Sequence, residues 1–262
     1  MKMVYTCMAL ACFHVAALHA QEKNVTLDSW FNNEHQKNAA GKMVSFHYKW
    51  EETGNNGFSK LGDAFKAQGA TLHTLYAAPT AATLENADIY IIVDPDNAKE
   101  SPDPKFIRKQ DVAAISRWVK NGGVLLLLAN DSANTELQHF NGLAAVFGLH
   151  FNDERINHVI DDAHFEDGAI PVKNDPVFRT TKKIFMKDAC SISVQPPGKA
   201  LLTSGGATII AATSYGKGTV VAVGDPWLYN EYVNGRLPAG YENDKAMTDL
   251  VTWLLAKVPA KQ

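Results

Sequence analysis

The sequence predicts an α/β fold in which helices cover a mainly parallel sheet. Residues 87–93 predict a buried strand, and the continuous apolar run 124–129 is typical of a strand buried on both faces. Residues 110–121 lie between them and carry apolar side chains at helical spacing. Later, residues 208–213 and 219–223 flank a Tyr-Gly-Lys-Gly turn and predict a β-hairpin. Strands that alternate with helices before a late hairpin indicate a mainly parallel sheet in an α/β domain.

The remaining elements follow from the same two patterns, taken in chain order. Short apolar runs predict two further strands, at 43–46 and 70–75. Helical spacing of apolar residues predicts three further helices, at 57–68, 136–147 and 244–257. Residues 151–200 lose the regular alternation and hold four prolines, so we expect an irregular excursion with short strands there.

The first twenty residues have the pattern of a secretory signal. Lys2 precedes an apolar run over 4–18, and Ala20 precedes a polar stretch. The run is too short for a membrane span, and the residues before Cys12 fit a lipid-anchor motif poorly. We therefore expect a signal peptide over 1–20, a lead-in segment over 21–42 and one α/β domain over 43–262, in a periplasmic or secreted protein.

Charge and cysteine usage exclude several classes of function. The formal net charge is −3 and no basic cluster stands out, so nucleic acid is not an expected partner. Cys190 would be the one cysteine left after signal cleavage, and it has no histidine near it in sequence, which favours a structural role. His47, His139 and His150 form no zinc-binding pattern, so no metal and no cofactor are expected.

Polar and aromatic residues gather where four of the predicted strands end. Ligands of open α/β sheets bind in the crevice outside the carboxyl ends of the strands. Aromatic faces together with carboxylates and amides suit a sugar. The expected ligand-binding residues are His47, Trp50, Asn55, Asp94, Asp96, Asn130, Asp131, Trp227, Tyr229 and Asn230. Two alternatives compete: Asn130-Asp131 can simply cap a helix, and Trp50 and Trp227 can be core residues.

A catalytic role for the same edge would need paired carboxyl groups. Glycoside hydrolases use two of them, about 5–5.5 Å apart for retention or roughly 6.5–9.5 Å apart for inversion. Asp225, Glu231 and Glu51 are the candidates for such an acid and base. The spacing in sequence does not say which two would meet.

The order of elements resembles the class I glutamine amidotransferase-like fold, a flavodoxin-like three-layer sandwich. The likeness rests on the Asn121-Gly122-Gly123 turn before a strand, and on the late hairpin that leads to a polar loop. In that family the turn after the strand carries a nucleophilic cysteine, and the later loop carries a histidine and a glutamate. Here these places read Asn130-Asp131-Ser132 and Gly224-Asp225-Pro226-Trp227, so the resemblance implies the fold without glutaminase activity.

A second resemblance is to the C-terminal domain of Bacteroidetes unsaturated rhamnogalacturonyl hydrolases. It is carried by His47-Tyr48-Lys49-Trp50-Glu51, Asn56-Gly57-Phe58, Val93-Asp94-Pro95-Asp96, Glu100-Ser101-Pro102, His139-Phe140-Asn141 and Gly224 to Tyr232. The hydrolase chemistry of those proteins belongs to a separate helical barrel. The resemblance therefore implies a context, pectin breakdown outside the cytoplasm, and no catalytic residue.

Three functions remain open from the sequence. The first is an exported module that binds or helps to process pectin (rhamnogalacturonan) oligosaccharides. The second is a glycoside hydrolase that acts on such oligosaccharides. The third is a non-catalytic interaction domain for a separate partner glycosidase.

Overall fold

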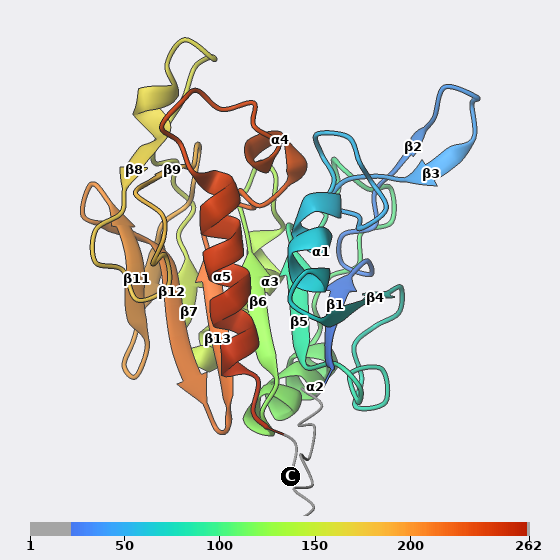
Figure 1. Cartoon of the computed structure of the whole chain (residues 1–262). Coiled ribbons are helices and arrows are strands. Elements are labelled where there is room, and N and C mark those ends of the chain that lie inside the picture. Colours follow the sequence, from blue (N-terminus) through green and yellow to red (C-terminus); the bar gives the residue numbers. More distant parts are fainter. Residues whose placement is uncertain (1–21, 261–262) are drawn as a thin grey trace, which may run out of the picture.

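The computed structural model describes residues 22–260 and is built around a seven-stranded sheet (Figure 1). The strand order is β11-β12-β13-β6-β5-β1-β4. Its strands are β1 (Lys23–Asp28), β4 (Ala70–Leu75), β5 (Ile89–Val93), β6 (Val124–Leu128), β11 (Lys199–Ser204), β12 (Ala207–Tyr215) and β13 (Gly218–Val223). The five strands from β13 to β4 are parallel, whereas β12 runs antiparallel to both of its neighbours.

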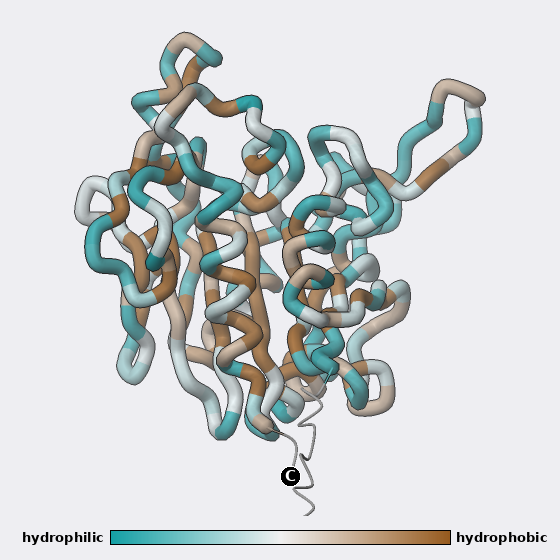
Figure 2. Tube along the Cα trace, in the orientation of Figure 1, coloured by the Kyte–Doolittle hydropathy of each residue, from teal (hydrophilic) through white to brown (hydrophobic). Residues whose placement is uncertain are grey.

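Helices cover both faces of this sheet. The helices α1 (Ser59–Lys66) and α5 (Asn243–Lys257) share one hydrophobic cluster with one face of the strands. The helices α2 (Lys109–Lys120) and α3 (Leu137–Ala144) share a second cluster with the opposite face. Figure 2 shows hydrophobic residues along the strands and α5, with hydrophilic loops around them. The prediction of a flavodoxin-like three-layer sandwich with a late hairpin is confirmed.

Shorter elements surround the main sheet. The helix α4 (Asn230–Val233) follows β13. Two 3₁₀ turns are present, Ala145–Phe147 directly after α3 and Phe165–Gly168 directly before residue 169. Three small antiparallel pairs complete the structure: β2 (His35–Lys37) with β3 (Met43–Ser45), β7 (Leu149–Phe151) with β10 (Ile192–Val194), and β8 (Ala169–Pro171) with β9 (Lys183–Phe185). The expected excursion over 151–200 therefore consists of short paired strands and turns. No helix of residues 22–260 has the length and apolarity that a membrane crossing needs.

The N-terminal part of the sheet corrects one prediction. Residues 43–45 form β3 of a hairpin that projects from the body, not the first strand of the sheet (Figure 1). The sheet strand is β1, which lies inside the expected lead-in segment 21–42 and pairs with β4 and β5. The apolar run Met43-Val44 was misleading because both side chains remain at least partly exposed in the hairpin. The expected signal peptide over 1–20 lies outside the described residues.

Candidate functional site

The carboxyl ends of the parallel strands carry a buried group of acids. Asp28 ends β1, Asp94 follows β5 and Asp225 follows β13, and all three side chains are almost fully buried. The structure therefore places polar residues where the fold predicts a crevice. Their burial decides what they can do there, because a buried carboxyl is costly to ionise.

Asp94 is the centre of one hydrogen-bond group. The Tyr48 hydroxyl donates to Asp94 Oδ2 at 3.2 Å, and the Thr135 hydroxyl donates to Oδ1. Thr135 Oγ1 also accepts from the Asn130 backbone N–H at 2.7 Å, so it ties together the loops after β5 and β6. Burial raises the pKa of Asp94 well above its usual value. Asp94 itself has a φ of +44°, which an ordinary residue adopts rarely.

Asp225 lies in a similarly dry place. It is 2% exposed, and its Oδ2 atom has no hydrogen-bond partner among the described residues. Burial raises the pKa of Asp225 to about 8. Its carboxyl lies near Tyr229 and Tyr232. Burial, followed by Asp225, raises the pKa of Tyr229, and burial, followed by Tyr229 and then Asp225, raises the pKa of Tyr232. At neutral pH Asp225 is therefore mostly protonated, which removes it as a charged nucleophile.

A buried lysine organises the end of β1. Lys49 Nζ donates to the Asn32 carbonyl at 2.7 Å and to Asn32 Oδ1 at 3.0 Å, and burial lowers the pKa of Lys49. Asp28 accepts from the Tyr90 hydroxyl at 2.5 Å, and burial raises the pKa of Asp28 to about 6. Sequence reasoning missed Asp28 and Lys49. A signal was available in β1, where apolar Val25 and Leu27 alternate with polar residues before Asp28.

Asp96, an expected ligand residue, belongs to the same buried region. Its Oδ2 accepts from the Asn33 backbone N–H at 3.0 Å, and Oδ1 has no partner among the described residues. Burial raises the pKa of Asp96 to about 6. His47, another expected ligand residue, has its Nδ1 2.8 Å from Glu34 Oε1 and its ring stacked on Tyr48 at 3.8 Å between centroids.

The two tryptophans expected to stack on a sugar are part of the core. Trp227 is 0% exposed and packs edge-on against Phe178, while Trp50 is buried against Phe58 and Phe65. The Trp50 indole N–H donates to the His73 carbonyl at 3.0 Å. Neither ring offers a free face to a ligand, so the competing core interpretation describes both residues. Tyr229 is half-buried and meets Tyr232 at 4.8 Å between centroids.

Asn230 joins two loops, and both polar atoms of its side chain form hydrogen bonds within the protein. Its Nδ2 donates to the carbonyls of Glu52 at 3.1 Å and Gly54 at 2.8 Å, and to Ser59 Oγ at 3.0 Å. Its Oδ1 accepts from the Lys60 backbone N–H at 3.1 Å. Asn55 takes part in the same junction, because its carbonyl accepts from the Glu231 N–H at 3.0 Å. Asn230 therefore acts as a structural clamp in this structure, and its expected role in ligand binding stays a prediction.

Asn130 and Asp131 shape the turn before α3. Asn130 Oδ1 accepts from the Asp131 N–H at 2.8 Å, and Asp131 Oδ1 accepts from the Ala133 N–H at 3.0 Å. Arg155 closes the turn by an ion pair of 2.9 Å with Asp131 Oδ2. The carboxylate of Asp131 is therefore occupied by the turn and by Arg155.

The three carboxylates proposed as acid and base lie in unlike surroundings. Asp225 is buried, Glu231 forms an ion pair with Arg236, and Glu51 is exposed. None of these three side chains lines the open groove described below. A metal does not unite them either, since residues 22–260 contain no group of three or more His, Cys, Asp or Glu side chains arranged to hold one.

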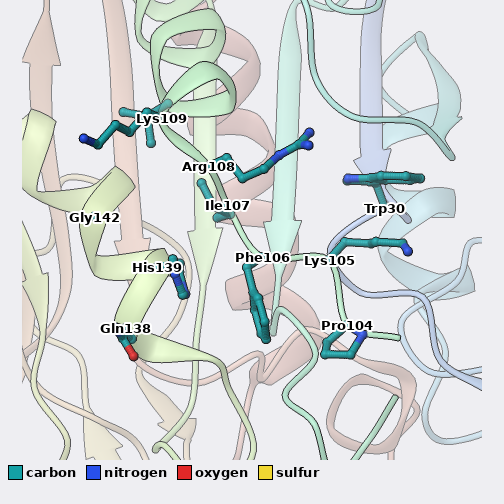
Figure 3. Close-up of a pocket in the computed structure, with 11 residues that line it drawn as sticks. Trp30, Pro104, Lys105, Phe106, Ile107, Arg108, Lys109, Gln138, His139 and Gly142 are labelled. Atoms are coloured by element: carbon teal, nitrogen blue, oxygen red, sulfur yellow. The ribbon is translucent and has the colours of Figure 1, made fainter. Parts of the chain in front are cut away.

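An open groove lies beside this buried edge, between the N-terminal halves of α2 and α3 (Figure 3). We call it the α2–α3 groove. Its volume is about 750 Å³, within the usual range for small-molecule sites. The lining residues are Trp30, Pro104, Lys105, Phe106, Ile107, Arg108, Lys109, Val112, Gln138, His139 and Gly142. They come from the loop after β1, from the loop that leads into α2 and from both helices, so no single sequence motif marks the groove.

Aromatic rings form part of the groove wall. Phe106 is 41% exposed and stacks on His139 with 5.0 Å between ring centroids. On the other side, Lys105 Nζ lies 5.5 Å from the ring centroid of Trp30. In Figure 3 Phe106 and His139 lie together near α3, and Trp30 and Lys105 lie together at the end of β1. The groove thus combines apolar ring faces with hydrogen-bond donors.

A family model described as "Domain of unknown function (DUF4350)" matches residues 51–234, which is most of the chain. The chain therefore belongs to the DUF4350 family. No curated protein matches the sequence.

Solved structures agree on the fold. The mmIFT52 N-terminal domain is similar with a TM-score of 0.65 and 16% identity, over 89% of this chain and 97% of that one. Cytoplasmic Protein STM3548 from Salmonella typhimurium gives a TM-score of 0.59 and 17% identity, over 91% and 100%. A β-galactosidase from Bacillus circulans sp. alkalophilus gives 0.52 and 11%, over 90% of this chain and 31% of that one. The fold is class I glutamine amidotransferase-like, and it resembles one part of multidomain glycosidases.

Proposed function

We propose that this chain is an exported, non-catalytic module that binds pectin-derived oligosaccharides in the α2–α3 groove. The observation that carries the proposal is the open groove itself, where an exposed aromatic face lies beside polar and cationic side chains. The proposed binding site is therefore the α2–α3 groove, and not the neighbouring strand-end loops that the sequence indicated. The reason is that the tryptophans of those loops are buried in the core.

The chemistry of a sugar fits this lining. A pyranose ring has apolar faces that pack on aromatic rings and hydroxyl groups that need hydrogen-bond partners. Phe106 and Trp30 supply ring surface, and Gln138 and Arg108 supply amide and guanidinium groups at the wall. The volume of about 750 Å³ suits a short oligosaccharide better than a single small ion.

The pectin context of the proposed function rests on resemblance to other proteins. The sequence resembles domains attached to rhamnogalacturonyl hydrolases, and the fold resembles parts of a β-galactosidase and of an exo-β-1,4-mannosidase. These likenesses support an association with carbohydrate enzymes. The pattern of the first twenty residues supports export.

The test is calorimetric titration with a panel of pectic oligosaccharides, together with product analysis after long incubation. We expect binding without turnover. Phe106→Ala should weaken binding about 10-fold, because an aromatic contact contributes about 1 kcal/mol or slightly more. Trp253→Ala is the matched control: it removes a partly exposed aromatic ring from α5, on the opposite face of the sheet, and should leave the affinity unchanged.

Three results would contradict the proposal. If no oligosaccharide of the panel binds, the sugar-binding role is wrong and an interaction domain for a partner glycosidase is the better description. If Phe106→Ala binds as well as the wild type, the ligand lies elsewhere. If products form and Asp225→Asn abolishes them, the chain is a hydrolase.

A further inference from the structure

We infer that the α2–α3 groove selects sugars that carry a carboxylate, and that Lys109 is the residue that distinguishes them from neutral sugars. This inference rests on the proposed function and names its ligand class. Its starting point is charge. The groove lining contains Lys105, Arg108 and Lys109 and no Asp or Glu, although the whole chain has a net charge of −3. A positive groove on a negative chain favours an anionic ligand.

The three cations differ in how free they are. Lys105 forms an ion pair with Asp103 and faces the ring of Trp30. Arg108 lies 3.2 Å from the buried carboxylate of Asp111. Lys109 is exposed, and no carboxylate within residues 22–260 forms an ion pair with it. Lys109 is thus the cation that can meet a ligand without first leaving a protein partner.

The place of Lys109 in its helix strengthens this preference. It is the first residue of α2, where the helix dipole already contributes positive charge. A cation at this end of a helix is electrostatically unfavourable in the free protein. A bound anion relieves that repulsion, so part of its binding energy comes from an interaction that a neutral sugar does not make.

The directions of the side chains fit one carboxylate per sugar ring. In Figure 3 Lys109 extends toward α3 and Arg108 extends toward Trp30, so the two cations flank opposite sides of the groove above Ile107 and Phe106. A uronic acid that stacks one ring face on Phe106 presents its carboxylate at the edge of the ring. That edge is where an ammonium or guanidinium group can donate to it.

The first experiment compares oligogalacturonate with its methyl ester, which keeps ring and length but removes the charge. We expect the acid to bind about 10-fold more tightly than the ester at about 20 mM salt, since one or two charged contacts are lost. The advantage should shrink at about 300 mM salt, where the Debye length falls from roughly 20 Å to about 6 Å.

The second experiment assigns the effect to a residue. Lys109→Met should weaken binding of the acid about 5-fold and leave binding of the ester unchanged. Lys60→Met is the matched control. Lys60 is also exposed in the first turn of a helix, but in α1, on the opposite face of the sheet, so the variant makes the same change in net charge away from the groove.

The outcomes separate the inference from the function on which it rests. Equal binding of acid and ester overturns the carboxylate selectivity while the sugar-binding role stands. Equal losses in Lys109→Met and Lys60→Met also overturn it, because the effect is then one of net charge. Failure of both acid and ester to bind overturns the proposed function itself.

Discussion

The Asn230 clamp makes a quantitative prediction about stability. Asn230→Ala removes the contacts of both side-chain polar atoms: the two N–H donors of Nδ2 are shared among three acceptors in residues 52–59, and Oδ1 accepts from the Lys60 N–H. The last of these acts as the missing cap of α1, because the residue before the helix, Phe58, has no side chain that can accept it. The clamp therefore holds both a loop and a helix end.

The magnitude follows from the surroundings of each bond. A typical intramolecular hydrogen bond contributes about 0.5–1.5 kcal/mol, and a lost helix cap costs about 0.5–2 kcal/mol. Water can reach the carbonyl of exposed Gly54 after the truncation, which offsets part of the loss. We expect Asn230→Ala to lower the free energy of unfolding by about 3 kcal/mol. For a chain of this size the melting temperature should fall by roughly 6–12 °C.

Urea denaturation followed by tryptophan fluorescence measures this loss. The control is Asn234→Ala, four residues further on, which removes two hydrogen bonds of an exposed asparagine. It should cost less than about 1 kcal/mol. If the two variants lose similar amounts, or Asn230→Ala loses less than about 1 kcal/mol, Asn230 is not the clamp described here and its amide is again available for a ligand.

Two further predictions concern the carboxyl end of β13. The folded pKa of Asp225, about 8, lies above its usual value of 3.8, so its ionisation lowers the free energy of unfolding as pH rises from about 4 to about 8. Asp225→Asn removes this loss. In urea denaturation, the free energy of unfolding of the variant minus that of the wild type should therefore increase between pH 5 and pH 8. If that difference does not change with pH, the burial of this carboxyl is contradicted. Gly224→Ala should cost at least about 2 kcal/mol, because the added Cβ would lie 1.8 Å from the Cys190 carbonyl oxygen. Gly142→Ala, with open space around it in α3, should instead stabilise by about 0.5–1 kcal/mol, and equal effects would refute the close approach.

The regular part of the fold was predictable because burial on both faces leaves a plain sequence signal. The strands β5 and β6 are continuous apolar runs, and α2 repeats its apolar residues with helical spacing. The strand β1 gave a weaker signal, since polar Asn24 and Thr26 interrupt it. Its place between β4 and β5 follows from long-range pairing, which no local pattern reveals.

The candidate site was harder to predict for a related reason. That polar residues follow the strands was predicted correctly, but sequence does not show whether a loop side chain turns inward. The Trp227 side chain lies in the core, and the Asn230 amide donates a hydrogen bond to a neighbouring loop. The α2–α3 groove left no motif, because Trp30, Phe106 and His139 are brought together only by the packing of three segments.

The burial of the strand-end acids favours the proposed binding role over catalysis at this edge. In open α/β sheets this edge usually receives the ligand. Here Asp94 is closed in by Tyr48 and Thr135, and Asp225 is buried near Tyr229 and Tyr232. Burial raises the pKa of both carboxyls, that of Asp225 to about 8, and burial therefore disfavours the ionised form that a nucleophile or base of glycoside hydrolysis needs. An enzyme would have to open this edge to water before either acid could act. A binding module needs no such opening, because the α2–α3 groove is already accessible beside it.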